Sequence, residues 1–417
     1  MSAKLSGVMT APASKSEAHR RMICAGLTMG ETRLEGFMDS SDMAATIRCL
    51  KGLGATINRE DDTLIICGGN PKRRLPVLDC GESGSTLRFF VPIALSLTGG
   101  ATFRMHGLLG QRPMEVYREL FVPRGVTWRM GVGADCAAEL TVSGKMEAGQ
   151  YVLPGNVSSQ FVSGLLFALP LLEGESTLTV LPPVESVGYI NMTMEALLDS
   201  GITVKQNGPF SWTIPGGQKY QAQSGRLSGD YSQAAVMLCA AALGHDVAVT
   251  ALQQKTTQGD RAVLKHLEAL GAKIEETPQD VKVQGGELRG AVLDMHDCPD
   301  IAPILALTCQ LAKGESILKG CGRLKLKECD RLATTVSILN QLGGCAEVQG
   351  DDMVIRGVDT LKGGVEIDGC NDHRMVMLVA MAATICQEPV TVKGVEALNK
   401  SWPDFLNVYE SLGGIVK

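Results

Sequence analysis

The sequence predicts an α/β (α+β) protein of two domains, each made of about three copies of one repeated unit. Its 417 residues exceed the roughly 100–200 that form a typical single domain. A glycine that follows a helix-like stretch recurs about every 70 residues. Stretches rich in Ala, Leu and Met alternate with β-branched stretches along the whole chain. This alternation of helices and strands is typical of α/β and α+β folds.

The repeated glycine divides the chain into six units. It occurs at Gly54, Gly125, Gly201, Gly271, Gly343 and Gly413, with spacings of 71, 76, 70, 72 and 70 residues. Glycine is the expected residue just after a helix, because it adopts left-handed backbone angles without a steric cost. Each unit alone would expose an apolar helix face, so we expect the units to pack together in two globular groups.

The same elements follow one another inside each unit. The first is a helix, predicted at residues 19–29, 86–98, 160–172, 232–243, 302–313 and 374–386. A turn and a β-branched strand come next, as at 177–180, 247–250 and 390–392. A second amphipathic helix, clearest at 260–270 and 330–342, then leads to the repeated glycine and a further strand.

The composition limits the classes of partner. Hydrophobic residues make up 45% of the chain and charged residues 20%, which is ordinary for a globular protein. The formal net charge is −6, which disfavours a nucleic-acid binder held by a broad positive field. Any binding of anions must therefore come from local clusters of cations.

The thirteen cysteines contain no Cys-x-x-Cys pair, and several, such as Cys24, Cys239, Cys309 and Cys386, stand in apolar stretches. We interpret them as small buried side chains in a reducing compartment. The first ten residues lack the apolar core of a secretory signal, and the longest apolar run, 375–385, is too short to cross a bilayer. We expect a cytoplasmic protein with no membrane partner.

Polar motifs occupy one position in every unit, at the start of the first helix. They are Lys15-Ser16, Ser83-Gly84-Ser85, Ser158-Ser159-Gln160, Asp230-Tyr231-Ser232, Asp300 and Asp372-His373-Arg374. Ser and Asp at such positions commonly do no more than cap the helix. Helix starts also attract anions, because their N–H groups lack partners and the helix dipole is positive there.

Capping does not explain the cations beside these motifs, in a chain that is acidic as a whole. They are Lys15, Arg20, Arg88, Arg112, Lys327, Arg331, Arg374 and Lys400. Arg suits a two-point grip on phosphate or carboxylate, and Lys supplies a compact charge. The cluster indicates a substrate that carries several negative charges.

Two acids stand among the cations. Glu328 lies between Lys327 and Arg331, and Asp300 lies in an Asp-Cys-Pro-Asp-Ile segment. Each carboxylate could simply balance the nearby positive charge. Each could equally transfer a proton to or from a bound substrate.

Several other chemistries are not supported by the sequence. It contains no P-loop motif and no convincing dinucleotide-binding fingerprint. The six histidines show no metal-ligand spacing. The Asp294, His296, Asp297 and Cys298 segment resembles a metal cluster, but we interpret it as a solvated acidic loop. We expect neither a metal nor a cofactor.

The order of the motifs resembles that of the 5-enolpyruvylshikimate-3-phosphate (EPSP) synthases, which belong to the enolpyruvyl transferases. The two most specific matching segments are 327–331, Lys-Glu-Cys-Asp-Arg, and 371–375, Asn-Asp-His-Arg-Met. Supporting matches are 12–16, 84–86, 111–113, 157–161 and 400–404, so the resemblance covers nearly the full length.

The resemblance implies a two-domain inside-out α/β barrel with three folding units per domain and an active site in the interdomain cleft. Domain 1 would be discontinuous and comprise residues 1–13 and 228–417, and domain 2 would comprise 14–227. The chain would cross between the domains near 12–14 and 226–230.

The resemblance also implies the reaction. The enolpyruvyl group of phosphoenolpyruvate would be transferred to the 5-hydroxyl of shikimate 3-phosphate through a tetrahedral intermediate, with release of phosphate. Both substrates carry a carboxylate and a phosphate, which accounts for the cation cluster. A monomer without a nucleic-acid partner, and sensitivity to the herbicide glyphosate, are further expectations.

Matching the motifs assigns expected roles to individual residues. Catalysis would use Asp300 as the base toward the 5-hydroxyl and Glu328 as the proton shuttle at the methylene, assisted by Lys15. Shikimate 3-phosphate would be bound by Lys15, Ser16, Arg20, Ser158, Ser159, Gln160, Ser186, Asp300 and Lys327. Phosphoenolpyruvate would be bound by Lys15, Gly84, Arg112, Gln160, Arg331, Arg374 and Lys400.

Two residues depart from the family pattern, and neither is assigned to a substrate. Glu82 stands where the family often has Asn, and Arg323 stands where some members have Asn. An anionic side chain beside phosphate would be unfavourable, so we expect Glu82 to point away from the site or to pair with a neighbouring Arg.

Two alternative functions remain open. UDP-N-acetylglucosamine enolpyruvyl transferases share the fold, but they typically have Lys-Asn at the position of Lys15-Ser16 and a reactive Cys shortly before the Arg-Pro motif. Here 108–111, Leu-Leu-Gly-Gln, precedes Arg112 without a cysteine. A non-catalytic repeat scaffold for phosphorylated ligands is the other alternative, and the presence of both Asp300 and Glu328 argues against it.

Overall fold

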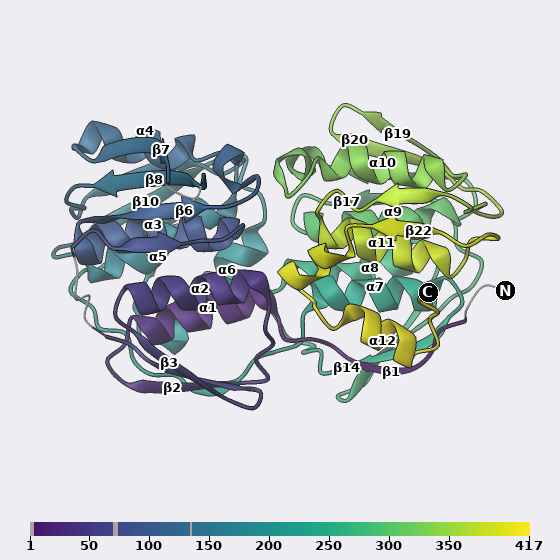
Figure 1. The fold of residues 1–417 in the computed structure, drawn as a ribbon, viewed down its shortest axis with the longest axis horizontal. Coiled ribbons are helices and arrows are strands. Elements are labelled where there is room, and N and C mark those ends of the chain that lie inside the picture. Colours follow the sequence, from purple (N-terminus) through teal and green to yellow (C-terminus); the bar gives the residue numbers. More distant parts are fainter. Residues whose placement is uncertain (1–3, 70–73, 134–135) are drawn as a thin grey trace. The chain divides into compact units, whose positions relative to one another are not determined.

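The computed structural model describes residues 4–69, 74–133 and 136–417. The chain divides into two compact units. The continuous unit is Lys15–Leu227, and the discontinuous unit combines Met1–Ser14 with Ser228–Lys417. Each unit contains three copies of the repeat that the glycine spacing predicts, and Figure 1 shows them as successive bands of colour.

The continuous unit begins with α1 (Lys15–Gly26), β2 (Glu31–Glu35), α2 (Ser41–Gly52), β3 (Thr56–Glu60) and β4 (Thr63–Cys67). Its second repeat comprises β5 (Val77–Asp79), α3 (Gly84–Thr98), β6 (Gly100–Met105), α4 (Glu115–Phe121), β7 (Thr127–Val132) and β8 (Ala138–Ser143). Its third comprises β9 (Gln150–Pro154), α5 (Ser159–Ala168), β10 (Ser176–Leu181), α6 (Val187–Asp199), β11 (Lys205–Gly208) and β12 (Ser211–Ile214), and β13 (Gly225–Arg226) follows.

The discontinuous unit contains β1 (Ser6–Thr10), α7 (Tyr231–Ala242), β14 (Asp246–Thr250), α8 (Ala262–Ala269), β15 (Lys273–Glu276) and β16 (Asp280–Gln284). Its next repeat comprises β17 (Val292–Asp294), α9 (Ala302–Gln310), β18 (Glu315–Lys319), α10 (Arg331–Gln341), β19 (Cys345–Gln349) and β20 (Asp352–Arg356). The last comprises β21 (Glu366–Asp368), α11 (His373–Ala383), β22 (Thr391–Lys393) and α12 (Phe405–Ser411).

The sheets share one topology. A leading strand pairs in parallel with the strand after the first helix, and an antiparallel hairpin completes the sheet, as in the order β5-β6-β8-β7. Five sheets have four strands. Within the described residues the sixth sheet has only two, β21 and β22.

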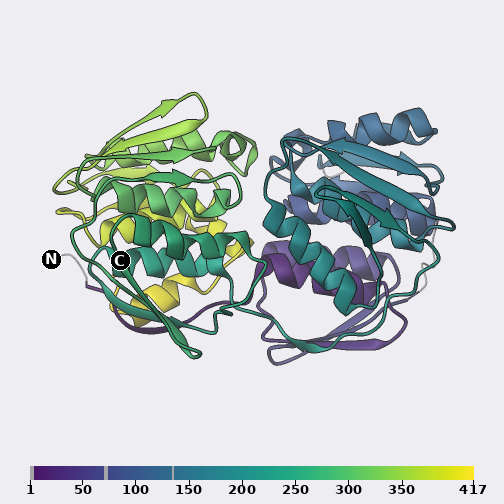
Figure 2. The ribbon, with the colours of Figure 1, turned by 180° about the vertical axis from the view of Figure 1, so that it is seen from behind.

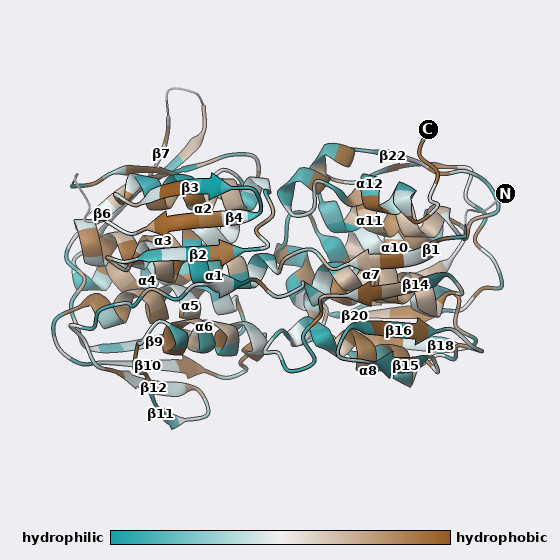
Figure 3. Ribbon diagram, turned by 90° about the horizontal axis from the view of Figure 1, so that it is seen from below, coloured by the Kyte–Doolittle hydropathy of each residue, from teal (hydrophilic) through white to brown (hydrophobic). Residues whose placement is uncertain are grey.

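The first helix of each repeat lies in the interior of its unit. Every residue of α7 and of α9 is buried. Helices α7, α9 and α11 contact one another, and α3 contacts α5 in the other unit. The sheets lie outside these helices, and strands such as β4, brown in Figure 3, are apolar and largely buried. This arrangement is the predicted inside-out α/β organisation.

Two strands are exchanged between the repeats. Strand β1 precedes α1 in the sequence but pairs with β14, while β13 precedes α7 but pairs with β2. Figures 1 and 2 show the purple β1 beside the teal β14 from the front and from behind. Each exchanged strand occupies the position that a leading strand occupies in the other sheets.

The cysteines that stand in apolar stretches are buried, as predicted for Cys24, Cys239, Cys309 and Cys386. None of the helices within the described ranges has the length and apolar character that crossing a membrane would require.

Candidate active site

The predicted site residues divide between the two units. Those on the continuous unit, called the continuous set below, are Lys15, Ser16, Arg20, Gly84, Arg112, Ser158, Ser159, Gln160 and Ser186. Those on the discontinuous unit, called the discontinuous set below, are Asp300, Lys327, Glu328, Arg331, Arg374 and Lys400.

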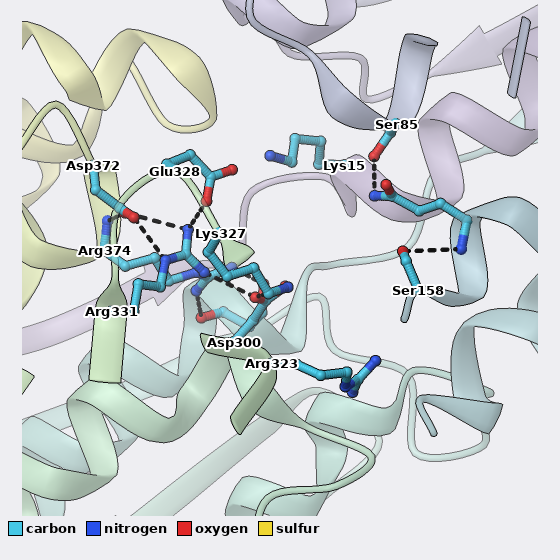
Figure 4. A network of polar contacts seen from close by, with 12 residues as sticks. Lys15, Ser85, Ser158, Asp300, Arg323, Lys327, Glu328, Arg331, Asp372 and Arg374 are labelled. Carbon is cyan, nitrogen blue, oxygen red and sulfur yellow. Dashed lines mark hydrogen bonds and ion pairs between the residues drawn. The ribbon is translucent and has the colours of Figure 1, made fainter. Parts of the chain in front are cut away.

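The discontinuous set is built around the guanidinium of Arg331, the first residue of α10, whose side chain is 2% exposed. Its NH1 pairs with Asp300 Oδ1 at 2.9 Å and its NH2 with Glu328 Oε2 at 2.6 Å. Its Nε pairs with Asp372 Oδ2 at 2.7 Å. Figure 4 shows the three carboxylates around this one cation. Arg331 thereby fixes the two acids that the sequence singled out.

Asp300 is ionised at neutral pH. It lies in a short 3₁₀ turn (Pro299–Ile301) and accepts hydrogen bonds from Arg331 and, at 2.9 Å, from Lys327 Nζ. Burial acts to raise the pKa of this carboxyl, but the cations of Lys327, Arg374 and Arg331 lower it well below its usual range. Burial lowers the pKa of the Lys327 ammonium, an effect that Asp300 partly offsets.

Glu328 is held in place and remains accessible. Its side chain is 20% exposed, and Oε2 is paired with Arg331 three residues later. A carboxyl group that is oriented by a cation and reachable from solvent can take up and release a proton without rearrangement of the chain.

Two further cations complete the discontinuous set. Arg374, the second residue of α11, donates from NH1 to the Ser232 carbonyl and from NH2 to Ser232 Oγ, both at 2.7 Å. Lys400 ends the 3₁₀ segment Val395–Lys400 and donates to the Asn371 carbonyl at 2.8 Å.

In the continuous set, Arg20 is held by neutral acceptors. Its Nε donates to Thr193 Oγ1 at 2.8 Å, NH1 to the Ser16 carbonyl at 2.7 Å and NH2 to the Tyr189 carbonyl at 3.0 Å. The guanidinium also lies 5.4 Å from the centre of the Phe89 ring and 5.8 Å from that of Tyr189. Burial lowers its pKa to about 10, which still leaves it charged at neutral pH.

Gln160 is oriented at both ends of its amide. Its Oε1 accepts from Arg88 NH1 and its Nε2 donates to Ser85 Oγ, both at 2.7 Å. Its backbone N–H donates to Ser158 Oγ, the N-cap of α5, at 3.3 Å. Figure 4 labels the two serine partners, Ser85 and Ser158. Arg88 also donates to the Pro113 carbonyl at 3.1 Å. It therefore holds Gln160 beside the segment that carries Arg112.

Gly84 allows a cation to lie against the start of a helix. It is the first residue of α3, and a β-carbon there would be 2.7 Å from Arg112 NH1. The guanidinium of Arg112 thus lies over a helix N-terminus, where N–H groups and the dipole already favour an anion.

The remaining residues of the continuous set also lie at helix starts. Lys15 begins α1 and pairs with Asp42 Oδ2 of α2 at 2.9 Å. Ser159 begins α5. Ser186 precedes α6 with a φ of 55°, in the left-handed region that residues other than glycine seldom adopt. Such strain is concentrated at functional sites.

The structure also places the two residues that depart from the family pattern. The Glu82 carboxyl group lies over Gly107, where a β-carbon would be 2.7 Å from Glu82 Cδ. Arg323 donates from NH2 to the His296 carbonyl at 2.8 Å. Neither observation tests a contact with substrate.

Sequence reasoning missed the groups that hold the predicted cations. Asp42 pairs with Lys15, Asp372 with Arg331, and Thr193 accepts from Arg20. Asp372 could have been recognised, because it lies in the 371–375 motif. Asp42 and Thr193 carry no local signal.

No group of three or more His, Cys, Asp or Glu side chains in the described ranges is arranged to hold a metal ion. In the acidic loop, His296 Nδ1 pairs with Asp294 Oδ1 at 2.6 Å, and both side chains are exposed. Cys298 is instead buried, with its Sγ 3.5 Å from His266 Nε2.

Known proteins resemble the chain over its whole length. A 3-phosphoshikimate 1-carboxyvinyltransferase from Clostridium botulinum is 39% identical over 99% of this chain and 96% of its own. One from Clostridium perfringens is 40% identical over 99% of this chain and 97% of its own.

The fold is that of solved enolpyruvyl transferases, which confirms the predicted two-domain α/β fold. The EPSP synthase of Acinetobacter baumannii matches with a TM-score of 0.81 at 24% identity, covering 100% of this chain and 98% of its own. The enolpyruvyl transferase NikO of Streptomyces tendae matches with a TM-score of 0.77 at 17% identity, covering 99% and 96%. The family model for EPSP synthase (3-phosphoshikimate 1-carboxyvinyltransferase) matches residues 1–409, and the chain therefore belongs to the EPSP synthase family.

Proposed function

We propose that the protein transfers the enolpyruvyl group of phosphoenolpyruvate to the 5-hydroxyl of shikimate 3-phosphate, giving 5-enolpyruvylshikimate 3-phosphate and phosphate. The observation that carries this proposal is the network in which Asp300 and Glu328 share Arg331, with Lys327 on Asp300. It combines groups that can move protons with cations that can bind two anionic substrates, in a chain of the EPSP synthase family.

The binding roles follow from the charges. We assign shikimate 3-phosphate to Lys15, Ser16, Arg20, Ser158, Ser159, Gln160, Ser186, Asp300 and Lys327. We assign phosphoenolpyruvate to Lys15, Gly84, Arg112, Gln160, Arg331, Arg374 and Lys400. The neutral acceptors around Arg20 leave its positive charge available to a phosphate dianion. Arg112 over the start of α3 would bind a second anion.

In the addition step, the 5-hydroxyl oxygen bonds to the central carbon of phosphoenolpyruvate while Glu328 protonates its methylene. Asp300 accepts the hydroxyl proton. Because its lowered pKa makes Asp300 a weak base, this transfer is favourable only as the new C–O bond forms and the hydroxyl becomes acidic. In the elimination step, Glu328 takes a proton back from the new methyl group as phosphate leaves.

The two sets lie on different units, so catalysis would require both sets to meet around the substrates in an interdomain cleft. A monomer in the cytoplasm, with shikimate 3-phosphate and phosphoenolpyruvate as its small-molecule partners, completes the proposal.

Release of inorganic phosphate from phosphoenolpyruvate tests the function. We expect release that depends on shikimate 3-phosphate and no release when UDP-N-acetylglucosamine replaces it. Release with the nucleotide sugar instead would identify the other enolpyruvyl transferase class. Binding of shikimate 3-phosphate without turnover would identify a non-catalytic scaffold.

A further inference from the structure

Residues at the start of α7, which are not predicted site residues, hydrogen-bond to Arg374 and to the residue after Lys400. Asp230, Ser232 and Gln233 are all at least nine-tenths buried. This helix start lies at the position in the repeat that carries substrate-binding candidates elsewhere. Here its side chains contact protein groups: Ser232 contacts Arg374, and Gln233 Nε2 donates to Ser401 Oγ at 2.6 Å.

The hydrogen atoms of this cluster have one consistent order. Ser232 Oγ donates its single proton to Asp230 Oδ1 at 2.6 Å. The lone pairs of the hydroxyl are then directed elsewhere, and one accepts from Arg374 NH2 at 2.7 Å. Asp230 Oδ1 also accepts the backbone N–H groups of Ser232 and Gln233, so it caps α7 and orients the serine at once.

Ser232 holds the plane of the Arg374 guanidinium at two points. Its carbonyl accepts from NH1 and its hydroxyl from NH2, both at 2.7 Å. A planar guanidinium held by two acceptors keeps its remaining N–H groups in fixed directions. Arg374 is only 7% exposed, and its Nε–H is buried without an acceptor among the described residues.

Gln233 extends the support to the neighbouring cation. Ser401 follows Lys400 in the sequence, so Gln233 holds the side chain of the residue next to Lys400. One helix start therefore contacts the side chain of one phosphoenolpyruvate candidate, Arg374, and that of the residue after another, Lys400.

We propose that Ser232, oriented by Asp230, is a positioning residue that sets the Arg374 guanidinium for phosphoenolpyruvate without contacting the substrate. This inference rests on the proposed function. Arg331 is held by carboxylates, but Arg374 donates to the carbonyl and the hydroxyl of Ser232, which orient it without a direct ion pair.

The test is Ser232→Ala, measured by steady-state kinetics with each substrate varied in turn. Loss of a hydrogen bond to a charged group predicts an increase of about tenfold to a hundredfold in KM for phosphoenolpyruvate. KM for shikimate 3-phosphate should stay within about threefold, because the lost hydrogen bond orients a residue that is proposed to bind phosphoenolpyruvate only. Ser232→Thr keeps the hydroxyl and should restore most of the affinity.

The matched control is Ser316→Ala. Ser316 is also buried in the same unit, but its hydroxyl accepts from the Ala291 backbone N–H, and it is not one of the predicted site residues. It reports the cost of deleting a buried hydroxyl, and we expect both KM values of this variant to be unchanged. If Ser232→Ala does not fold, Ser232→Cys, which is nearly the same size and a weaker acceptor, should show the same selective increase.

An unchanged KM for phosphoenolpyruvate in a folded Ser232 variant would overturn the inference and leave the proposed function intact. An equal rise in both KM values, or the same pattern in Ser316→Ala, would reduce Ser232 to a structural residue. If the wild-type protein showed no turnover, the proposed function would fail. Calorimetry with inorganic phosphate would then decide the inference: weaker binding to Ser232→Ala than to wild type supports it, and equal binding overturns it.

Discussion

Two buried arginines in this protein are held in opposite ways. Arg331, in the discontinuous unit, is surrounded by the carboxylates of Asp372, Glu328 and Asp300, which raise its pKa although burial acts against them. Arg20, in the continuous unit, is held by a hydroxyl and two carbonyl groups, and burial lowers its pKa to about 10.

The difference shows what each arginine can do for an anionic substrate. Arg331 has its charge balanced by carboxylates, so it fixes the geometry of Asp300 and Glu328, the two acids proposed to move protons. The hydroxyl and carbonyl acceptors of Arg20 are neutral, so its positive charge can be used to bind an anionic ligand. The surroundings of Arg331 thus suit it to orienting acids, and those of Arg20 suit it to binding a phosphate.

The strongest way to break this comparison is Glu328→Gln, which keeps the size of the side chain and one acceptor for Arg331 but cannot exchange a proton. We expect kcat to fall by at least about a hundredfold while binding of shikimate 3-phosphate stays within about tenfold. Solvent deuterium should enter the phosphoenolpyruvate methylene more slowly, in parallel with kcat. Exchange and turnover near the wild-type rate would show that Glu328 is only a partner of Arg331.

Replacing each arginine by Gln tests the comparison through stability. Arg331→Gln leaves the buried carboxylate of Asp372 without its cation and should cost about 3–5 kcal/mol of unfolding free energy. Arg20→Gln leaves only neutral acceptors and should cost about 1–2 kcal/mol, while KM for shikimate 3-phosphate increases. Urea unfolding of both variants measures the difference. Equal losses of stability would refute the distinction between the two arginines.

Asp300→Asn probes the same network through pH. The lowered pKa means that ionised Asp300 stabilises the fold at every pH above its ordinary value of about 3.9. The variant should therefore be less stable than wild type by about 1–3 kcal/mol, and this difference should be constant from pH 5 to 8. The difference from wild type should shrink only as the pH falls below about 4, toward the lowered pKa. A difference that already shrinks near neutral pH would contradict the assignment.

In the continuous unit, Gly84→Ala should act on Arg112. The added methyl would be 2.7 Å from its NH1, so the guanidinium must move. Overpacking typically costs about 1–3 kcal/mol. If this cost falls on binding at Arg112, KM for phosphoenolpyruvate should increase about tenfold and glyphosate should inhibit less strongly. Gly131→Ala is the matched control, because a β-carbon there meets nothing within 4 Å. Equal inhibition of wild type and Gly84→Ala would remove Gly84 from the site.

The smallest expected effect is a change in the size of the molecule when the substrate binds. If shikimate 3-phosphate draws the two units together, X-ray scattering should show a smaller radius of gyration at saturation than for the apo protein. The same radius in both states, with binding demonstrated by calorimetry, would count against the cleft.

The sequence predicted the parts of the fold that depend on local chemistry. The repeated glycine and the polar helix starts mark local backbone requirements, and Ser83, Ser158, Asp230 and Asp372 do cap helices. The expected helix at 160–172 is shorter, because Pro170 limits α5 to Ala168 and the chain continues as a 3₁₀ turn (Leu169–Leu171).

The acceptors that hold the cations could not be predicted in the same way. Thr193 lies 173 residues from Arg20, and Ser232 lies 142 residues from Arg374. Serine and threonine are too common for a pattern to single out such partners. The roles of the cations came from the family resemblance, but the contrast between neutral and acidic surroundings required the structure.

The exchange of β1 and β13 has a consequence for the order in which a ribosome can complete the two units. The sheet of the continuous unit that contains β2 is complete once residue 226 has emerged, because β13 closes it. Strand β1 is made first, but its partner β14 follows about 240 residues later. We therefore expect the continuous unit to fold while β1 is still without its partner strand, and synthesis that stops near residue 227 to leave a folded unit with β1 unpaired.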